Sequence, residues 1–358
     1  MKHLFDAALF LVRVTSGRCG ETVCRDIMLE TESSVIPAKV YQHPDTKKIT
    51  GTVISVAGLS VYGIDDPRIV LLNRAIARSG FLVISPLFQE IRTFTITSAS
   101  IDHLVEASHA VMQRKELCPS GTVSFIAPSF SGGICLAAAA KRENAGRIDA
   151  VCTIGTFSNV RNVLRYLMES PESDEYGRLI VLKNFIHYAL GMCPELERAL
   201  ELAYLDNGYQ RESGELDSWL TGMSHLNRLL FFKLMNDIEF RTAVWEDIEN
   251  KMRHELDIFE QLDVVSLAGT ISGHCVFIHG ERDDVIPPSE SVMMHEAVLR
   301  AGGESTLAVT PLISHGDTRY TITMLPKLLK LISAFGNFFR SASVPPLALH
   351  RAMRTDIV

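Results

Sequence analysis

The sequence contains none of the common short signatures of metal, redox or nucleotide sites. Its seven cysteines include no CxxC pair, and its twelve histidines form no HxxxH or HExxH pair. Zinc centres and redox dithiols depend on such spacings, so neither is expected. The absence of a GxGxxG or Walker sequence argues against a bound nucleotide, and we expect no metal and no cofactor. The odd, scattered cysteines are instead typical of buried thiols in a reducing compartment.

Basic charge and long apolar runs are also scarce. Lys and Arg number 35 against 42 Asp and Glu, a net charge of −7 that argues against a nucleic-acid partner. No stretch approaches the ~20 apolar residues of a transmembrane helix. The apolar run 7–12 lies between Asp6 and Arg13 and is too short for a secretory signal. We therefore expect a docked amphipathic helix within residues 1–21, with a peripheral membrane contact as the less favoured alternative, and a cytoplasmic protein.

What the chain does contain is an alternation of short apolar runs with helical patterns. Strands are expected at 52–56, 81–85, 122–127, 150–154, 274–279 and 306–309. Helices are expected near 67–79, 101–116, 132–143, 287–302 and 319–340. Because buried strands interleaved with helices form βαβ units, we predict an α/β fold with a mostly parallel central sheet and helices on both faces. Residues 22–41 predict an antiparallel hairpin at one edge of that sheet.

One interval departs from the alternation. Residues 160–268 show no strand-like run and hold 20 acidic and 11 basic side chains, a net charge of −9. We predict a helical cap inserted over these residues into a discontinuous core of residues 22–159 and 269–340, with a tail at 341–358. The insertion's aromatic side chains either line an apolar pocket or form its own core, and the second role is expected for most of them. They are Phe185, Tyr188, Trp219, Phe231, Phe232, Phe240 and Trp245.

The main chemical feature is the segment 123–137, in which an apolar strand leads into Ser129 and small residues begin a helix. This is the layout of a nucleophile elbow, usually G-x-S-x-G, where the flanking positions must be small because the backbone is crowded. Here those positions are Ala127 and Ser131. Ser131 is the alternative nucleophile, but it would require Pro128 to continue the strand, and central strands tolerate proline poorly.

An acid and a histidine come later in the chain. Asp283 lies three residues after Gly280, at the end of one apolar run, and His315 follows another; Asp284 is the alternative acid. Serine, acid and histidine occur in this order in α/β-hydrolases. The elbow, the acid loop and the histidine loop together resemble the α/β-hydrolase superfamily over about residues 25–158 and 270–340.

The resemblance implies a role for each of these residues. Ser129 would attack a carbonyl carbon, His315 would accept the proton of Ser129, and Asp283 would orient the imidazole. The backbone N–H groups of Phe130 and Leu59 would bind the developing oxyanion.

Two further features concern the neighbours of these residues. The loop before Leu59 carries Ala57-Gly58 where the superfamily usually has His-Gly. His274 and His279, which flank the strand before Asp283, are interpreted as packing or loop residues.

The resemblance implies a serine hydrolase that cleaves a carboxylic ester or thioester through an acyl-enzyme. The Ala-x-Ser-x-Ser elbow resembles that of acyl thioesterases of the superfamily, which favours a fatty-acyl substrate, either as a small molecule or on an acyl carrier. The alternatives are an acyltransferase using the same triad and a non-catalytic hydrolase-like binding protein. The oligomeric state cannot be inferred from the sequence.

Overall fold

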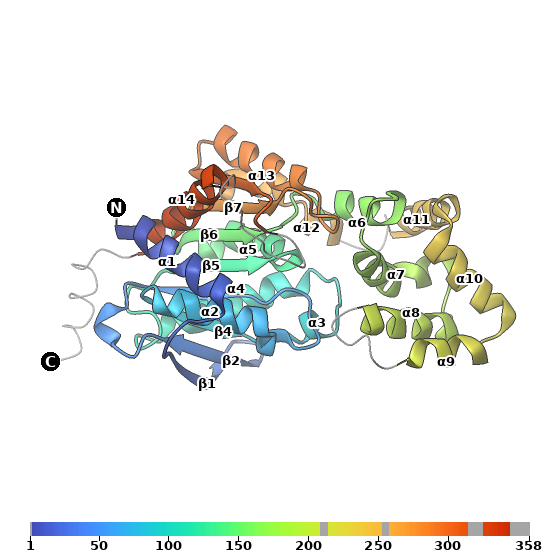
Figure 1. The fold of residues 1–358 in the computed structure, drawn as a ribbon, viewed down its shortest axis with the longest axis horizontal. Coiled ribbons are helices and arrows are strands. Elements are labelled where there is room, and N and C mark those ends of the chain that lie inside the picture. Colours follow the sequence, from blue (N-terminus) through green and yellow to red (C-terminus); the bar gives the residue numbers. More distant parts are fainter. Residues whose placement is uncertain (1, 208–213, 253–257, 314–324, 344–358) are drawn as a thin grey trace. The chain divides into compact units, whose positions relative to one another are not determined.

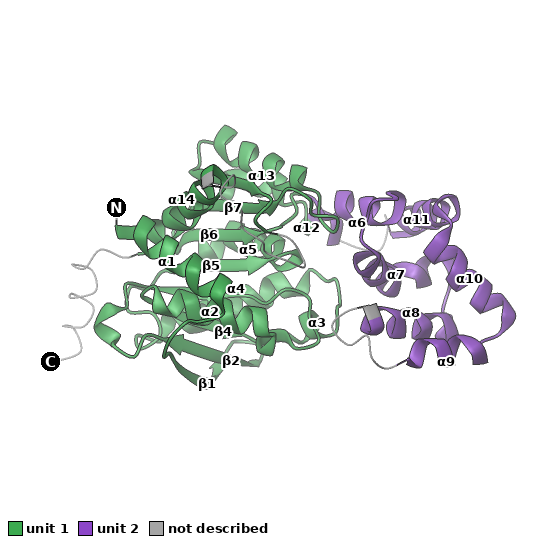
Figure 2. Ribbon diagram, viewed as in Figure 1, with its two compact units in different colours: residues 1–158, 261–358 green, residues 159–260 purple. Residues whose placement is uncertain are grey.

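The computed structural model describes residues 2–207, 214–252, 258–313 and 325–343. The chain divides into two units (Figure 2): unit 1 comprises residues 1–158 and 261–358, and unit 2 comprises residues 159–260. Unit 2 is therefore a single insertion into the chain of unit 1. No described helix is long and apolar enough to cross a bilayer.

Unit 1 contains an eight-stranded sheet in the order β1-β2-β4-β3-β5-β6-β7-β8 (Figure 1). The strands are β1 (Val23–Glu30), β2 (Val35–Gln42), β3 (Gly51–Ser55), β4 (Phe81–Pro86), β5 (Val123–Pro128), β6 (Ile148–Ile154), β7 (His274–Gly280) and β8 (Ser305–Thr310). The pairs β1–β2 and β2–β4 are antiparallel, and the remaining pairs are parallel. The predicted α/β class, with a mostly parallel sheet and a hairpin at one edge, is confirmed.

The connections place helices on both faces of the sheet. The helices of unit 1 are α1 (Lys2–Ser16), α2 (Pro67–Arg78), α3 (Gln89–Arg92), α4 (Ala99–Gln113), α5 (Phe130–Ala140), α13 (Pro288–Arg300) and α14 (Leu325–Ser341), with 3-10 helices η1 (Thr46–Lys48), η2 (Gly63–Asp65), η3 (Arg142–Asn144) and η4 (Val264–Thr270). The chain steps from β3 to β4 through α2 and then back across β3 to β5 through α4. Because parallel crossovers are right-handed, this reversal puts α2 and α4 on opposite faces.

The amphipathic N-terminal helix expected from the sequence is α1. It packs on α14 through Phe10, whose ring centroid lies 4.6 Å from that of Phe335 and 5.4 Å from that of Phe339. The predicted helix at 319–340 is described from Leu325 onward, and its first six residues lie outside the described part of the chain. The predicted tail is described only as far as residue 343.

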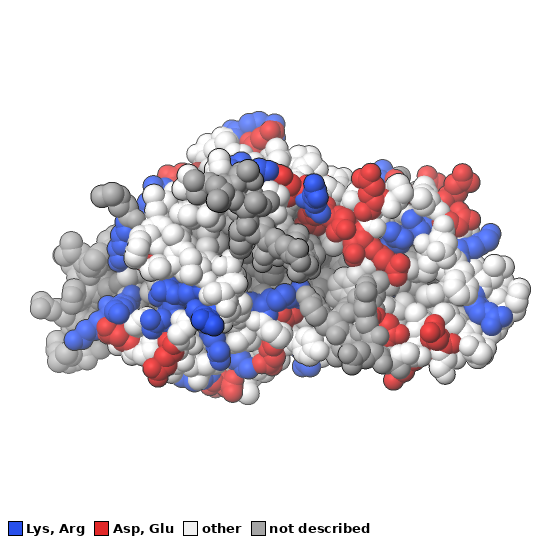
Figure 3. All heavy atoms as spheres, viewed as in Figure 1, with Lys and Arg blue, Asp and Glu red and all other residues white. Residues whose placement is uncertain are grey.

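Among its described residues, unit 2 consists of helices joined by short connections and contains no strand. Its helices are α6 (Val160–Glu169), α7 (Glu175–Leu190), α8 (Pro194–Asn207), α9 (Glu215–Gly222), α10 (His225–Asn236), α11 (Ile238–Met252) and α12 (Ile258–Gln261). Trp245 is fully buried and meets Phe185 edge-on at 6.5 Å, whereas Trp219 and Phe232 are exposed. On the visible face of this unit, acidic side chains outnumber basic ones (Figure 3).

Two glycines allow the first turn of α5 to pack tightly against the segment after β6. A Cβ atom on Gly132 would lie 2.6 Å from Thr156 Oγ1, and one on Gly133 would lie 2.1 Å from Phe157 Cζ. The Phe157 ring is buried and contacts the ring of Phe130 at a centroid distance of 5.6 Å. An added methyl group at either glycine has no room without a shift of its neighbours.

We predict that Gly133→Ala destabilises the protein by about 1–3 kcal/mol, the usual cost of overpacking a closed core. Urea unfolding measures this change. Gly269→Ala is the matched control in the same unit, because its Cβ would meet the nearest atom, Ala301 Cβ, at an ordinary 3.7 Å. An equally stable Gly133→Ala variant would contradict the packing described here.

Candidate active site

Ser129 occupies a sharp turn between β5 and α5. Its backbone has φ 55° and ψ −137°, a combination that side-chain-bearing residues rarely adopt. Among the described residues, only Ser129 and Phe94 have a positive φ without being glycine. Such strain costs about 1–3 kcal/mol and persists only where the surroundings enforce it. Here the Ser129 N–H donates to Ile154 O at 2.8 Å, and Gly132 N–H donates to Ser129 O at 3.0 Å.

The structure differs from expectation around Pro128. Strand β5 includes Pro128, which pairs with Ile154, so the proline does not end the strand as the sequence argument assumed. Because Ser129 N–H donates toward β6, the missing N–H of Pro128 faces β3, whose pairing with β5 ends at Ile126. The proline therefore removes no ladder hydrogen bond. Helix α5 correspondingly begins at Phe130, two residues before the predicted start.

Ser131, the alternative nucleophile, lies inside the first turn of α5. It is fully buried, and its Oγ donates to Ala57 O at 2.5 Å. Ser129, by contrast, is half-buried at the turn itself. Of the two serines, Ser129 is the one whose hydroxyl lies at the strained turn.

Asp283 lies in the loop after β7 and close to the end of β6. Its side chain is 7% exposed, and Oδ1 accepts the backbone N–H groups of Val285 at 3.0 Å and Ile286 at 2.9 Å. A Cβ on Gly155 would lie 3.0 Å from Asp283 Oδ2. Gly155 directly follows Ile154, the residue that accepts the Ser129 N–H, so the acid and the serine lie at neighbouring strand ends. Asp284, the alternative acid, is exposed.

His279, in β7, is hydrogen-bonded to the loop that carries Asp283. It is fully buried, with Nδ1 2.6 Å from Ser291 Oγ and Nε2 2.8 Å from Ile286 O. Because a carbonyl oxygen can only accept, Nε2 carries a proton, and it lies 3.6 Å from Asp283 Oδ2. The sequence interpretation of His279 as a packing residue did not identify these polar contacts. A histidine inside an otherwise apolar strand was the available signal.

The third predicted member of the triad is His315. His315 lies outside the described residues, which stop at 313 before resuming at 325. Of the three predicted residues, the structure describes Ser129 and Asp283, at the ends of neighbouring strands.

Two backbone N–H groups are available where the oxyanion site was predicted. Phe130 is the first residue of α5, and the N–H groups at a helix N-terminus have no partner within the helix. In the part of the chain that the structure describes, neither Phe130 N–H nor Leu59 N–H donates to a protein acceptor. A Cβ on Gly58, which precedes Leu59, would lie 3.4 Å from Pro128 Cγ, so this loop packs against the end of β5.

The far end of the same loop is fixed by a buried carboxylate. Ser60 Oγ donates to Asp66 Oδ2 at 2.8 Å, and Arg92 Nε donates to Val61 O at 3.3 Å. Asp66 also caps α2 by accepting the N–H of Arg68. Burial opposes ionisation of Asp66, but hydrogen bonds from Arg68 and Ser60 lower its pKa. The charged carboxylate thus holds both the helix start and the loop.

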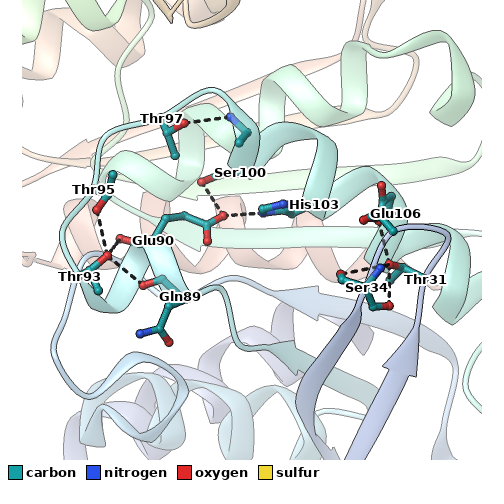
Figure 4. Close-up of polar contacts among 12 residues, drawn as sticks. Thr31, Ser34, Gln89, Glu90, Thr93, Thr95, Thr97, Ser100, His103 and Glu106 are labelled. Atoms are coloured by element: carbon teal, nitrogen blue, oxygen red, sulfur yellow. Dashed lines mark hydrogen bonds and ion pairs between the residues drawn. The ribbon is translucent and has the colours of Figure 1, made fainter.

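A polar cluster around Glu90 links α3 to α4 (Figure 4). Glu90 Oε1 accepts from Ser100 Oγ at 3.0 Å and lies 2.8 Å from His103 Nδ1. Further along α4, Glu106 accepts from Thr31 Oγ1 at 2.8 Å, which links the helix to the β1–β2 turn. The sequence analysis did not identify this cluster, and its bonds are those of a structural brace.

No metal centre is formed by the side chains that the structure describes. No group of three or more His, Cys, Asp and Glu residues among them could hold an ion.

Comparison with known proteins gives a structural likeness only. No protein-family model matches the sequence, and no curated protein matches it. The structure of the Pyrococcus horikoshii acylaminoacyl peptidase matches with a TM-score of 0.52 and 10% identity over 95% of this chain and 45% of its own. This chain thus spans less than half the length of that protein. A variant of the esterase rPPE matches with a TM-score of 0.52 and 10% identity over 94% of this chain and 89% of its own. Together with the eight-stranded sheet and the turn at Ser129, these likenesses show that the chain has the α/β-hydrolase fold.

Proposed function

We propose that the protein is a serine hydrolase that cleaves a carboxylic ester or thioester, with Ser129 as the nucleophile. The strained backbone of Ser129 at the N-terminus of α5 is the observation that carries this proposal. A conformation of this cost is retained where a function depends on it. The shared fold adds support, because the matching structures include a peptidase and an esterase.

The proposed reaction has two stages. Ser129 Oγ attacks the carbonyl carbon while His315 takes its proton and passes it to the leaving group, and Asp283 orients the imidazole. Water then attacks the acyl-enzyme with His315 as the base, the bond from the acyl carbon to Ser129 Oγ breaks, and His315 returns the proton to Ser129 Oγ as the carboxylic acid leaves. The N–H groups of Phe130 and Leu59 would bind the oxyanion in both stages, each contributing about 3–4 kcal/mol to transition-state stabilisation.

The cellular setting is a further proposal. All seven cysteines are free and five of them are buried, which fits a reducing compartment such as the cytoplasm. Burial raises the pKa of the Cys275 thiol to about 12, so this group stays protonated and inert at neutral pH.

The nucleophile can be tested with a fluorophosphonate probe, which reacts with activated serine hydroxyls. We expect the wild type to be labelled at Ser129, Ser129→Ala to take up no probe, and Ser131→Ala to retain a label at Ser129. Peptide mass mapping locates the label, and circular dichroism checks that each variant is folded. An unlabelled, folded wild type would refute the enzyme proposal, and label lost only in Ser131→Ala would move the nucleophile.

The acid can be tested with two neighbouring substitutions. We expect Asp283→Asn to lower kcat by about 10²–10⁴-fold, because the amide no longer stabilises the charged imidazole. The asparagine oxygen can still accept the N–H groups of Val285 and Ile286, so the loop should keep its shape. Asp284→Asn changes an exposed side chain and should alter kcat by less than about threefold. Steady-state kinetics on one ester substrate compare the two variants, and a larger effect at Asp284 would reverse the assignment.

The fatty-acyl preference rests on the resemblance of the elbow to that of acyl thioesterases. We expect kcat/KM on acyl thioesters and p-nitrophenyl esters to rise with acyl chain length, because each buried methylene contributes about 0.8 kcal/mol. Measurements on a series from two to sixteen carbons, approximately the range of common acyl groups, give the slope. A value that falls steadily with chain length would exclude this substrate class.

A further inference from the structure

The elbow of this chain carries serine where the usual pattern has glycine, and the structure indicates what the extra hydroxyl does. Ser131 is fully buried in the first turn of α5, and its Oγ donates to Ala57 O at 2.5 Å. The two residues are 74 positions apart in the sequence. This bond therefore ties the helix of the elbow to the loop after β3.

The hydrogen bond from Ser131 to Ala57 lies where the loop after β3 leaves the sheet. The Cα pairing of β3 with β5 ends at Ser55 and Ile126, and Val56 N–H still donates to Ile126 O at 3.0 Å. Ala57 comes next and is 2% exposed. The Ser131 hydroxyl thus supplies the next attachment of the chain after the ladder has ended.

The anchored carbonyl of Ala57 also orients the start of the loop. The peptide group is planar, so the orientation of Ala57 C=O sets that of the Gly58 N–H in the same unit. Leu59, the proposed second oxyanion donor, is the next residue. Beyond it, Ser60 is held by its hydrogen bond of 2.8 Å to Asp66. The segment carrying Leu59 is therefore held on both sides.

We propose that Ser131 is a positioning residue that sets the Leu59 N–H relative to the Phe130 N–H. One turn of α5 would then carry the nucleophile at its start, one oxyanion donor at Phe130, and the anchor of the other donor at Ser131. This inference rests on the proposed function for its catalytic part. The anchoring of the loop does not depend on catalysis and can be measured separately.

Three substitutions separate the hydroxyl from the size of the side chain. Ser131→Ala and Ser131→Gly both remove the hydroxyl, and the second restores the residue of the usual elbow pattern. Ser131→Thr keeps the hydroxyl. Ser108→Ala is the matched control, because Ser108 is also fully buried in a helix and its Oγ donates to a backbone carbonyl, that of Val105, at 2.8 Å.

The first readout is hydrogen exchange of the amides at 57–63. We expect faster exchange of these amides in Ser131→Ala and Ser131→Gly and wild-type exchange in Ser108→Ala. Unchanged exchange in folded Ser131→Ala and Ser131→Gly would overturn the anchoring, whether or not the protein is an enzyme.

The second readout is kinetic. We expect Ser131→Ala and Ser131→Gly to lower kcat on a p-nitrophenyl ester about 10–100-fold, somewhat less than the loss of an oxyanion donor itself, with KM within about threefold. Their affinity for a trifluoromethyl ketone, which forms a tetrahedral oxyanion on the serine, should fall in parallel with kcat/KM. Ser131→Thr should recover most of the loss, and Ser108→Ala should lose none.

Two results would contradict the catalytic part. Full activity in Ser131→Gly, with a mobile loop, would show that only a small residue is needed at this position. A wild type that takes up no fluorophosphonate would refute the proposed function itself, and the exchange experiment would then decide the anchoring alone.

Discussion

The left-handed backbone of Ser129 is the constraint on which the rest of the site depends. A strain of about 1–3 kcal/mol at one residue would relax if the neighbouring elements could move. They cannot move cheaply, because β5 is paired on both sides and residues 130–139 of α5 are all buried. Gly132 and Gly133 bring that helix so close to Thr156 and Phe157 that even one added carbon has no space. The sheet and the buried helix together hold the serine in its turn.

The same constraint organises the surroundings of the serine. A helix that must begin at residue 130 presents the N–H of Phe130 at its N-terminus and buries Ser131 in its first turn. The end of β6 lies between the serine and the acid. Ile154 O accepts the Ser129 N–H, and the next residue, Gly155, lies against the Asp283 carboxylate. The hydrogen bond between His279 Nε2 and Ile286 O restrains the loop that carries this carboxylate. The site is thus built from the ends of adjacent strands rather than from one continuous segment.

The fold could be predicted from hydropathy because strands β3 to β7 are buried on both faces and read as nearly continuous apolar runs. The edge hairpin of β1 and β2 is largely exposed and was predicted instead from its alternating pattern. Features that depend on individual hydrogen bonds were harder to predict from the sequence. Strand β5 continues through Pro128 because its missing N–H faces the side where pairing has already ended, which no composition rule reveals. The bond from Ser131 to Ala57 and the contacts of His279 join residues far apart in the sequence or buried in apolar surroundings. Such contacts depend on three-dimensional register, so the sequence indicates the residue types and not their partners.

The central claim is that the strained turn presents a nucleophile that becomes acylated. The most direct measurement is rapid acid quenching of the protein during turnover of a p-nitrophenyl ester, with intact-mass and peptide mass spectrometry of the quenched protein. The account predicts a covalent adduct with the mass of the acyl group, located on Ser129. Turnover with no adduct at any quench time, or an adduct located on another residue, would contradict it.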